Sequence, residues 1–175
     1  MSTLIELLKT RRSIRKYLPQ AIEPEKIKQI VSAALMSPAS KRSNPWEFIV
    51  VQDAAILAEL ADSRPHGSQL LANAPLGIVV IADTTKSDVW IEDASIAAII
   101  IQLQAHDLGL GSCWVQVYKR DKDESTTTEA YVRQLLGIPS HYAVLNVVSI
   151  GYPNEERKAF DMEKLAFDKV HSEKF

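Results

Sequence analysis

The chain has 175 residues, of which 46% are hydrophobic and 24% charged, as in an ordinary globular domain with a sizeable core. Its formal net charge of -2 and isoelectric point of about 6.1 argue against a general nucleic-acid binder, because such domains are usually basic. The single cysteine excludes an intramolecular disulfide and a cysteine-based zinc site.

No targeting or membrane segment stands out. The longest uninterrupted apolar run, Ile96 to Ile101, is far shorter than the ~20 residues that cross a bilayer. The first residues lack the charged and then apolar pattern of a signal peptide. We therefore expect a cytoplasmic protein with no membrane association. Because the chain has no repeat and no Gly/Ser linker, we also expect one domain over residues 1–175.

A basic segment follows the first expected helix, which covers residues 3–9. It contains Arg11, Arg12, Ser13, Arg15 and Lys16, so four cations and a hydroxyl occur within a few residues. Such a cluster repels itself unless an anion lies among the side chains, and the planar guanidinium matches a phosphate. In an extended segment, alternate residues leave the backbone on the same side, so Arg11, Ser13 and Arg15 can converge on one ligand. A solvated basic turn is the alternative interpretation.

A loop follows the second expected helix, which starts at Pro24, a favoured first helical residue. The helix must end near Met36, because Ser37 precedes Pro38 and is biased away from helical dihedral angles. Residues 37–45 are therefore expected to form a loop.

The remainder of the chain alternates between strand and helix patterns without a regular strand-helix-strand rhythm, which predicts an α+β fold. The helix over residues 88–108 is apolar almost all round from Ala94 to Ile101, so it should lie in the centre of the fold. Glu92 and Asp93 suit the positive dipole end of that helix. The expected strands are 48–52, 76–82, 112–117 and 143–150, and the other expected helices are 53–62 and 129–136.

The tail over residues 153–175 is polar with scattered apolar side chains. Such a segment cannot fold alone, so it needs another surface to cover it, and a second subunit would provide one.

Three blocks in this order resemble the FMN-dependent nitroreductase family in its short form. They are Arg11–Tyr17, then Ser37–Trp46 with the strand after it, and the long helix from Trp90 that leads to Leu108–Trp114. The resemblance extends from Leu4 to the tail. It implies a nitroreductase-like fold, with a mostly antiparallel central sheet flanked by helices around a buried long helix, in an interleaved homodimer.

The resemblance also implies a flavin site. Arg11, with Arg12 and Ser13 beside it, would hold the phosphate and ribityl region of FMN. Arg15 would approach the pyrimidine end of the ring, where a cation stabilises the negative charge that arrives with a hydride. No side chain is expected to act as nucleophile or general base, and no metal is expected.

Other implied contacts come from separate parts of the chain. Pro38, Ala39 and Ser40 match a loop that reaches the flavin of the other subunit. The family often has a serine in place of Ala39 and an asparagine in place of Arg42, so Arg42 either contacts phosphate or faces solvent. Gly67 matches a region near the polar edge of the flavin. Either Arg157 or Lys158 supplies a further cation to the phosphate, and we favour Lys158.

The implied activity is transfer of two electrons from NADH or NADPH through FMN to a nitroaromatic, quinone or similar small acceptor. The segment between Val117 and Glu129 is short, which leaves little material for a lid over the acceptor site. A flavin-binding storage or sensing protein without turnover is the alternative. Nucleic-acid binding through the basic segment is disfavoured by the acidic balance of the chain.

Overall fold

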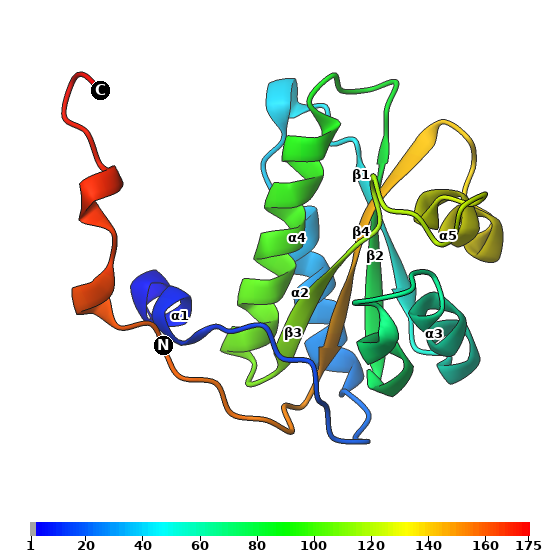
Figure 1. Ribbon diagram of the computed structural model, residues 1–175, viewed down its shortest axis with the longest axis horizontal. Coiled ribbons are helices and arrows are strands. Elements are labelled where there is room, and N and C mark those ends of the chain that lie inside the picture. Colours follow the sequence, from blue (N-terminus) through cyan, green and yellow to red (C-terminus); the bar gives the residue numbers. More distant parts are fainter. Residues whose placement is uncertain (1–2) are drawn as a thin grey trace.

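A four-stranded antiparallel sheet forms the centre of the computed structural model, which describes residues 3–175 (Figure 1). Its strand order is β1 (Trp46–Val51), β2 (Leu76–Asp83), β4 (Tyr142–Gly151) and β3 (Gly111–Gln116). Every residue of β2 is buried, as its continuous apolar run predicts for a strand covered on both faces. The expected α+β fold with a mostly antiparallel sheet is confirmed.

Helices cover both faces of the sheet (Figure 1). On one face, α2 (Pro24–Leu35) and α4 (Trp90–Asp107) pack on an apolar layer with side chains from β2 and β4. On the other face, a second apolar layer joins the sheet to α3 (Ala54–Ala61) and α5 (Thr128–Leu136). The first helix, α1 (Leu4–Thr10), buries none of its side chains and lies beside the C-terminal part of α4.

The long helix α4 is buried on one side only. Ala94, Ala97 and Ile101 are fully buried against the sheet, whereas Ile91 and Ile96 remain 37% and 38% exposed. A helix that is apolar almost all round is stable in water only when its second side is also covered. The exposed side of α4 is therefore a surface on which a second apolar surface would pack favourably.

The basic segment extends the sheet beyond β3. Ser13 forms a parallel bridge with Ser112, and the Ile14 N–H donates to the Ser112 carbonyl over 2.9 Å. This close approach requires Gly111, because a Cβ at that position would lie 2.7 Å from Ile14 Cβ. The edge of β3 thus fixes the start of the basic segment to the core of the protein.

The loop and the tail contain only single turns. Residues 37–45 include one 3-10 turn (Ser40–Arg42), and the tail includes two, Met162–Lys164 and Phe167–Lys169. The tail leaves the end of β4, passes α1 and continues away from the sheet (Figure 1). Phe167 and Val170 are 71% and 72% exposed, so this part of the tail has no apolar contact that shields it.

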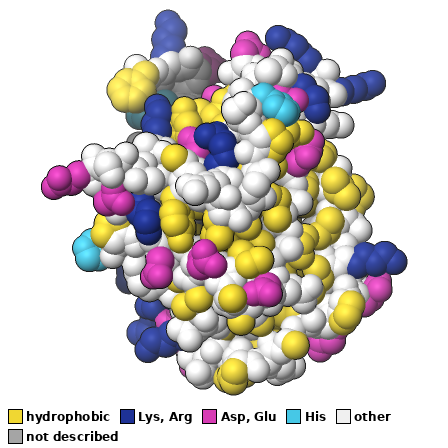
Figure 2. Space-filling model, turned by 90° about the vertical axis from the view of Figure 1, so that its right-hand side faces the viewer, with side chains coloured by type: hydrophobic (Ala, Val, Ile, Leu, Met, Phe, Trp, Pro, Cys, Tyr) yellow, Lys and Arg dark blue, Asp and Glu magenta, His cyan; other side chains and the backbone are white. Residues whose placement is uncertain are grey.

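Figure 2 shows the face of the molecule that α3 and α5 cover. Hydrophobic side chains lie across the middle of the face in Figure 2, and its Lys and Arg side chains are dispersed rather than gathered in one patch. Within residues 3–175, we find no helix that combines the length and the apolar character needed to cross a membrane.

We expect the Gly111→Ala substitution to destabilise the protein by about 1–3 kcal/mol, the usual cost of overpacking. The added methyl would push Ile14 off β3, so urea unfolding should show the loss and hydrogen exchange should show faster exchange of the Ile14 amide. Gly109→Ala is the control, because a Cβ there meets no atom within 4 Å although the backbone has φ of +77°. It should lower stability through backbone strain alone and leave the Ile14 amide protected. Equal protection in both variants would contradict this role of Gly111.

Candidate functional site

Four arginines surround one small pocket at the edge of β3. Its walls are formed by Arg11, Arg12, Ser13 and Arg15 from the basic segment, together with Arg157 and Phe160 from the tail, and its volume is about 300 Å³. The structure thus brings together the residues that the sequence grouped around a phosphate. Among the described residues, Arg11, Arg12 and Arg15 form no ion pair, so their charge is available to a ligand.

Glu155 is the carboxylate that organises this cluster. Its Oε1 accepts hydrogen bonds from the backbone N–H groups of Arg15, over 2.5 Å, and Lys16, over 3.3 Å. Its Oε2 lies 2.6 Å from Arg157 Nη2. The hydrogen bond from Arg15 and the charge of Arg157 hold the pKa of Glu155 below its ordinary value, so the group is an anion at neutral pH. One carboxylate among four guanidinium groups leaves the pocket strongly positive.

The tail forms one wall of the arginine pocket and contacts the basic segment that forms the other walls. The guanidinium of Arg12 lies over the ring of Phe160, 4.4 Å from its centroid, which is a cation–π contact. The Phe160 N–H donates to the Lys9 carbonyl over 2.9 Å, and the Asn154 N–H donates to the Lys16 carbonyl over the same distance. The basic segment therefore lies between the sheet and the tail.

Tyr17 fixes the part of the segment that presents Arg15. Its hydroxyl donates to the Ile14 carbonyl over 2.6 Å and bonds Ser149 Oγ over 2.7 Å. Burial raises the pKa of Tyr17, so the hydroxyl keeps its proton for these contacts. Gly151 makes room for the ring, since a Cβ there would lie 2.8 Å from Tyr17 Cδ1.

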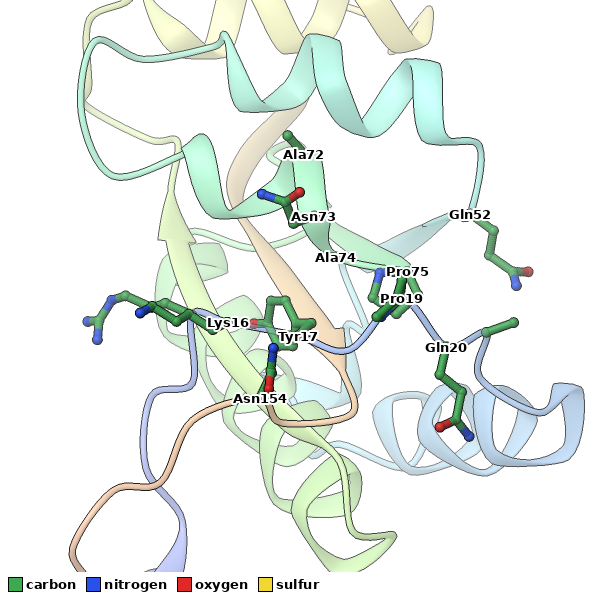
Figure 3. A pocket seen from close by; sticks show the side chains of 12 residues that line it. Lys16, Tyr17, Pro19, Gln20, Gln52, Ala72, Asn73, Ala74, Pro75 and Asn154 are labelled. Atoms are coloured by element: carbon green, nitrogen blue, oxygen red, sulfur yellow. The ribbon is translucent and has the colours of Figure 1, made fainter.

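A larger pocket adjoins the arginine pocket, with Arg15 on the wall of both. Its volume is about 690 Å³. Figure 3 shows that its side chains come from the basic segment and the residues after it, the end of β1, the turn before β2, and the start of the tail. Four of them are carboxamides, which both donate and accept hydrogen bonds: Gln20, Gln52, Asn73 and Asn154.

The loop with Pro38, Ala39, Ser40 and Arg42 lies far from both pockets of its own chain. The Ser40 N–H donates to Asp93 in the first turn of α4, whereas Thr10, next to Arg11, bonds His106 in the last turn. Asp93 and His106 are separated by thirteen residues of helix, which is about 20 Å. One small ligand cannot contact both segments of the same chain at such a separation.

Gly67 and Lys158, like the residues of that loop, line neither of the two pockets described above. Gly67 has φ of +89° in a loop near Arg64, and its N–H donates to Gln69. Lys158 is exposed on the tail, and its neighbour Arg157 lines the arginine pocket instead. The geometry therefore favours Arg157 over Lys158 as the cation that the tail contributes.

The described residues offer neither a reactive thiol nor a metal site. Cys113 is buried in β3, and burial raises the pKa of its thiol, so it remains protonated and a poor nucleophile. Across residues 3–175, the His, Cys, Asp and Glu side chains form no group that could hold a metal ion. The positive pocket and its polar neighbour are thus suited to an anionic organic ligand.

The sequence alone did not predict the larger pocket or the role of Glu155 in holding the basic segment. The carboxamides come from separate segments, so no local pattern connects them. Glu155 follows Gly151–Pro153 as one acid in a charged stretch, and only its contact with the backbone of Arg15 distinguishes it.

The chain belongs to the Nitroreductase family, whose sequence model matches residues 8–64 and 62–152. The resemblance noted in the sequence is thereby confirmed, and so is the expectation of an oxidoreductase enzyme at the level of this family. The match includes the basic segment, the loop over residues 37–45 and all four strands.

Individual relatives agree with this assignment. The chain is similar to a solved FMN-dependent nitroreductase of Clostridium difficile R20291, with a TM-score of 0.97 and 52% identity over 98% of this chain and 100% of that one. It is 38% identical, over the full length of both chains, to an Archaeoglobus fulgidus protein provisionally named NADH dehydrogenase/NAD(P)H nitroreductase. Mouse iodotyrosine deiodinase 1 is 25% identical over 94% of this chain and 67% of its own. The nitroreductase-like fold is confirmed by the first of these.

Proposed function

We propose that the protein is an FMN-dependent NAD(P)H oxidoreductase that passes two electrons to small acceptors such as nitroaromatics or quinones. The arginine pocket is the observation that carries this proposal. Its guanidinium groups and the Ser13 hydroxyl suit the terminal phosphate of FMN, which is a dianion that accepts several hydrogen bonds.

Arg15 lines both pockets, and this position supports one orientation of the bound cofactor, with its phosphate in the arginine pocket and its ring in the larger pocket. A phosphate among Arg11, Ser13 and Arg157 would place the remainder of the molecule toward the larger pocket. Its carboxamides suit the polar edge of a flavin, because that edge has both donors and acceptors. FMN, when bound, supplies the hydride and electron transfer. Arg15 supplies a fixed positive charge that stabilises the anionic reduced ring.

The acceptor site is proposed to be open and permissive. The segment between Val117 and Glu129 folds back on itself through a bridge between Asp121 and Thr127, and the Lys122 ammonium donates to the Asp62 carbonyl beside α3. It lines neither pocket, so it provides no lid over the larger one. NADH or NADPH would then alternate with the acceptor at one exposed flavin face.

We further propose that the active protein is a homodimer in which each flavin contacts two chains. The loop with Pro38, Ala39, Ser40 and Arg42 lies about 20 Å along α4 from the arginine pocket of its own chain, so a second copy would have to bring it to the flavin. The half-exposed side of α4 and the apolar tail are surfaces that a second subunit would cover.

The purified protein should be yellow and should release FMN on denaturation, and the FMN-loaded protein should oxidise NADH or NADPH in the presence of a quinone or nitroaromatic. Chromatography of the released cofactor and loss of absorbance at the nicotinamide band measure these outcomes. FAD in place of FMN, or no flavin after incubation with FMN, would contradict the proposal. Bound FMN without oxidation of either nucleotide would favour a storage or sensing protein.

The Arg15→Ala substitution should slow flavin reduction by NAD(P)H and lower the reduction potential, while the affinity for FMN changes less. Loss of one charge-assisted hydrogen bond costs about 1.5–3 kcal/mol, and the reduced state should be destabilised by roughly that amount. Rapid-mixing reduction and a redox titration measure both effects. Lys28→Ala, which removes an exposed cation of α2 away from the pockets, is the control. An unchanged reduction potential in the Arg15→Ala variant would show that Arg15 does not act on the flavin ring.

Shared sites predict complementation between two inactive variants. One variant carries Arg11→Ala with Arg15→Ala, and the other carries bulky replacements at Ala39 and Ser40. In a mixed dimer, the two-fold axis combines both defects in one site and leaves the other site whole. Mixed dimers purified through two different tags should therefore have about half of the wild-type activity. Inactive mixed dimers would show that both segments serve the flavin of their own chain.

A further inference from the structure

Asp93 is a carboxylate in an unusual position. It lies in the first turn of α4 but is only 2% exposed. Among the described residues it forms no ion pair, and its two oxygens are both used as hydrogen-bond acceptors: Oδ1 for the Ser40 N–H over 2.7 Å, and Oδ2 for the Ser87 hydroxyl over 2.8 Å. A favourable helix dipole alone would be satisfied by an exposed acid such as its neighbour Glu92, so burial of Asp93 requires another reason.

The loop that Asp93 holds is strained. Lys41, Arg42 and Asn44 have φ values of 53°, 56° and 42°, which non-glycine residues seldom adopt. Such residues destabilise the backbone, so the conformation persists only where surrounding contacts determine it. Three left-handed residues within four positions therefore need an anchor.

Two side-chain contacts join residues 40–42 of this loop to α4 and the residues before it, and at the end of the loop the Pro45 carbonyl accepts from the Asp83 N–H over 2.8 Å. One is the ion pair between Lys41 and Asp88, separated by 3.8 Å, in which both side chains are 81% exposed. Exposed pairs of this kind contribute little to stability. The other is the buried, charge-assisted hydrogen bond between Ser40 and Asp93, which belongs to a stronger class. Of the two side-chain contacts, the one with Asp93 is therefore the stronger, and it fixes the position of the Ser40 backbone.

We propose that Asp93 is a positioning residue for the flavin site of the partner subunit: it holds the Ser40 backbone so that Pro38, Ala39 and Ser40 are presented to the other chain's FMN. This inference rests on the proposed function. Asp93 touches neither cofactor nor substrate. It acts through the loop, so its substitution should affect the flavin site that the loop contacts, which is the site of the partner subunit.

Three single variants separate the hydrogen bond from the charge. Asp93→Ala removes the acceptor of the Ser40 N–H and should weaken FMN binding at least tenfold. Asp93→Asn keeps an acceptor oxygen of the same reach and should stay within about threefold of the wild type. Glu92→Ala removes an exposed acid from the same helical turn and should leave FMN affinity unchanged. Fluorescence titration with FMN measures all three. Unchanged affinity in Asp93→Ala, or equal losses in Asp93→Ala and Asp93→Asn, would overturn the proposal.

A second pair of variants removes the same bond from the loop side, which decides the matter if Asp93→Ala fails to fold. Ser40→Pro deletes the backbone N–H and leaves α4 intact, whereas Ser40→Ala deletes only the hydroxyl. Ser40→Pro should bind FMN at least several times more weakly than Ser40→Ala. Equal affinities would overturn the proposal.

Mixed dimers test whether Asp93 acts on the partner's site, which a merely structural role would not produce. Asp93→Ala paired with the Arg11→Ala, Arg15→Ala variant should regain about half of the wild-type activity, because one site then keeps both intact segments. If the bulky loop variant complements and Asp93→Ala does not, the inference fails while the proposed function stands. If the wild-type protein binds no FMN, the proposed function fails first, and this inference fails with it.

Discussion

The docking of the basic segment on the edge of β3 is the contact on which the candidate site depends. A sheet edge has unpaired backbone groups, and here the Ser112 carbonyl is taken by the Ile14 N–H. Two glycines allow the approach, because Cβ atoms at Gly111 and Gly151 would overlap Ile14 and Tyr17. The same contact that protects the edge thus buries two apolar residues of the segment and leaves its arginines on the wall of the pocket.

This arrangement brings four guanidinium groups together, which costs electrostatic free energy. The chain offsets part of the cost itself. Glu155 provides one negative charge and takes two backbone N–H groups of the segment, and the Phe160 ring lies against Arg12. One carboxylate does not balance four arginines, so an anion in the pocket would relieve the remaining repulsion. The phosphate ester proposed for this pocket would therefore stabilise the fold of the segment that binds it.

The sequence was sufficient to predict features whose residues lie close together along the chain. The arginines near the N-terminus lie within five residues, and the helices and strands follow local periodicity and capping signals, so both were predictable. That Arg157 and not Lys158 lines the arginine pocket was not predictable, because it depends on how the tail pairs with Lys9 and Lys16 far away in the chain. For Asp93, the sequence shows a position in the helix that suits the helix dipole but does not show burial beneath the loop.

The length of α4 has a consequence for any shared site. Near one end it is bonded to Thr10, beside the arginine pocket, and at the other end Asp93 holds the Ser40 loop. A straight helix keeps these two segments at a fixed separation, so neither segment of a chain can adjust to the other. In the proposed two-fold dimer, the spacing between the paired segments would depend on how the two copies of α4 are placed. Apolar side chains on the exposed side of α4, such as Ile91 and Ile96, would therefore influence flavin binding through the interface without touching the flavin.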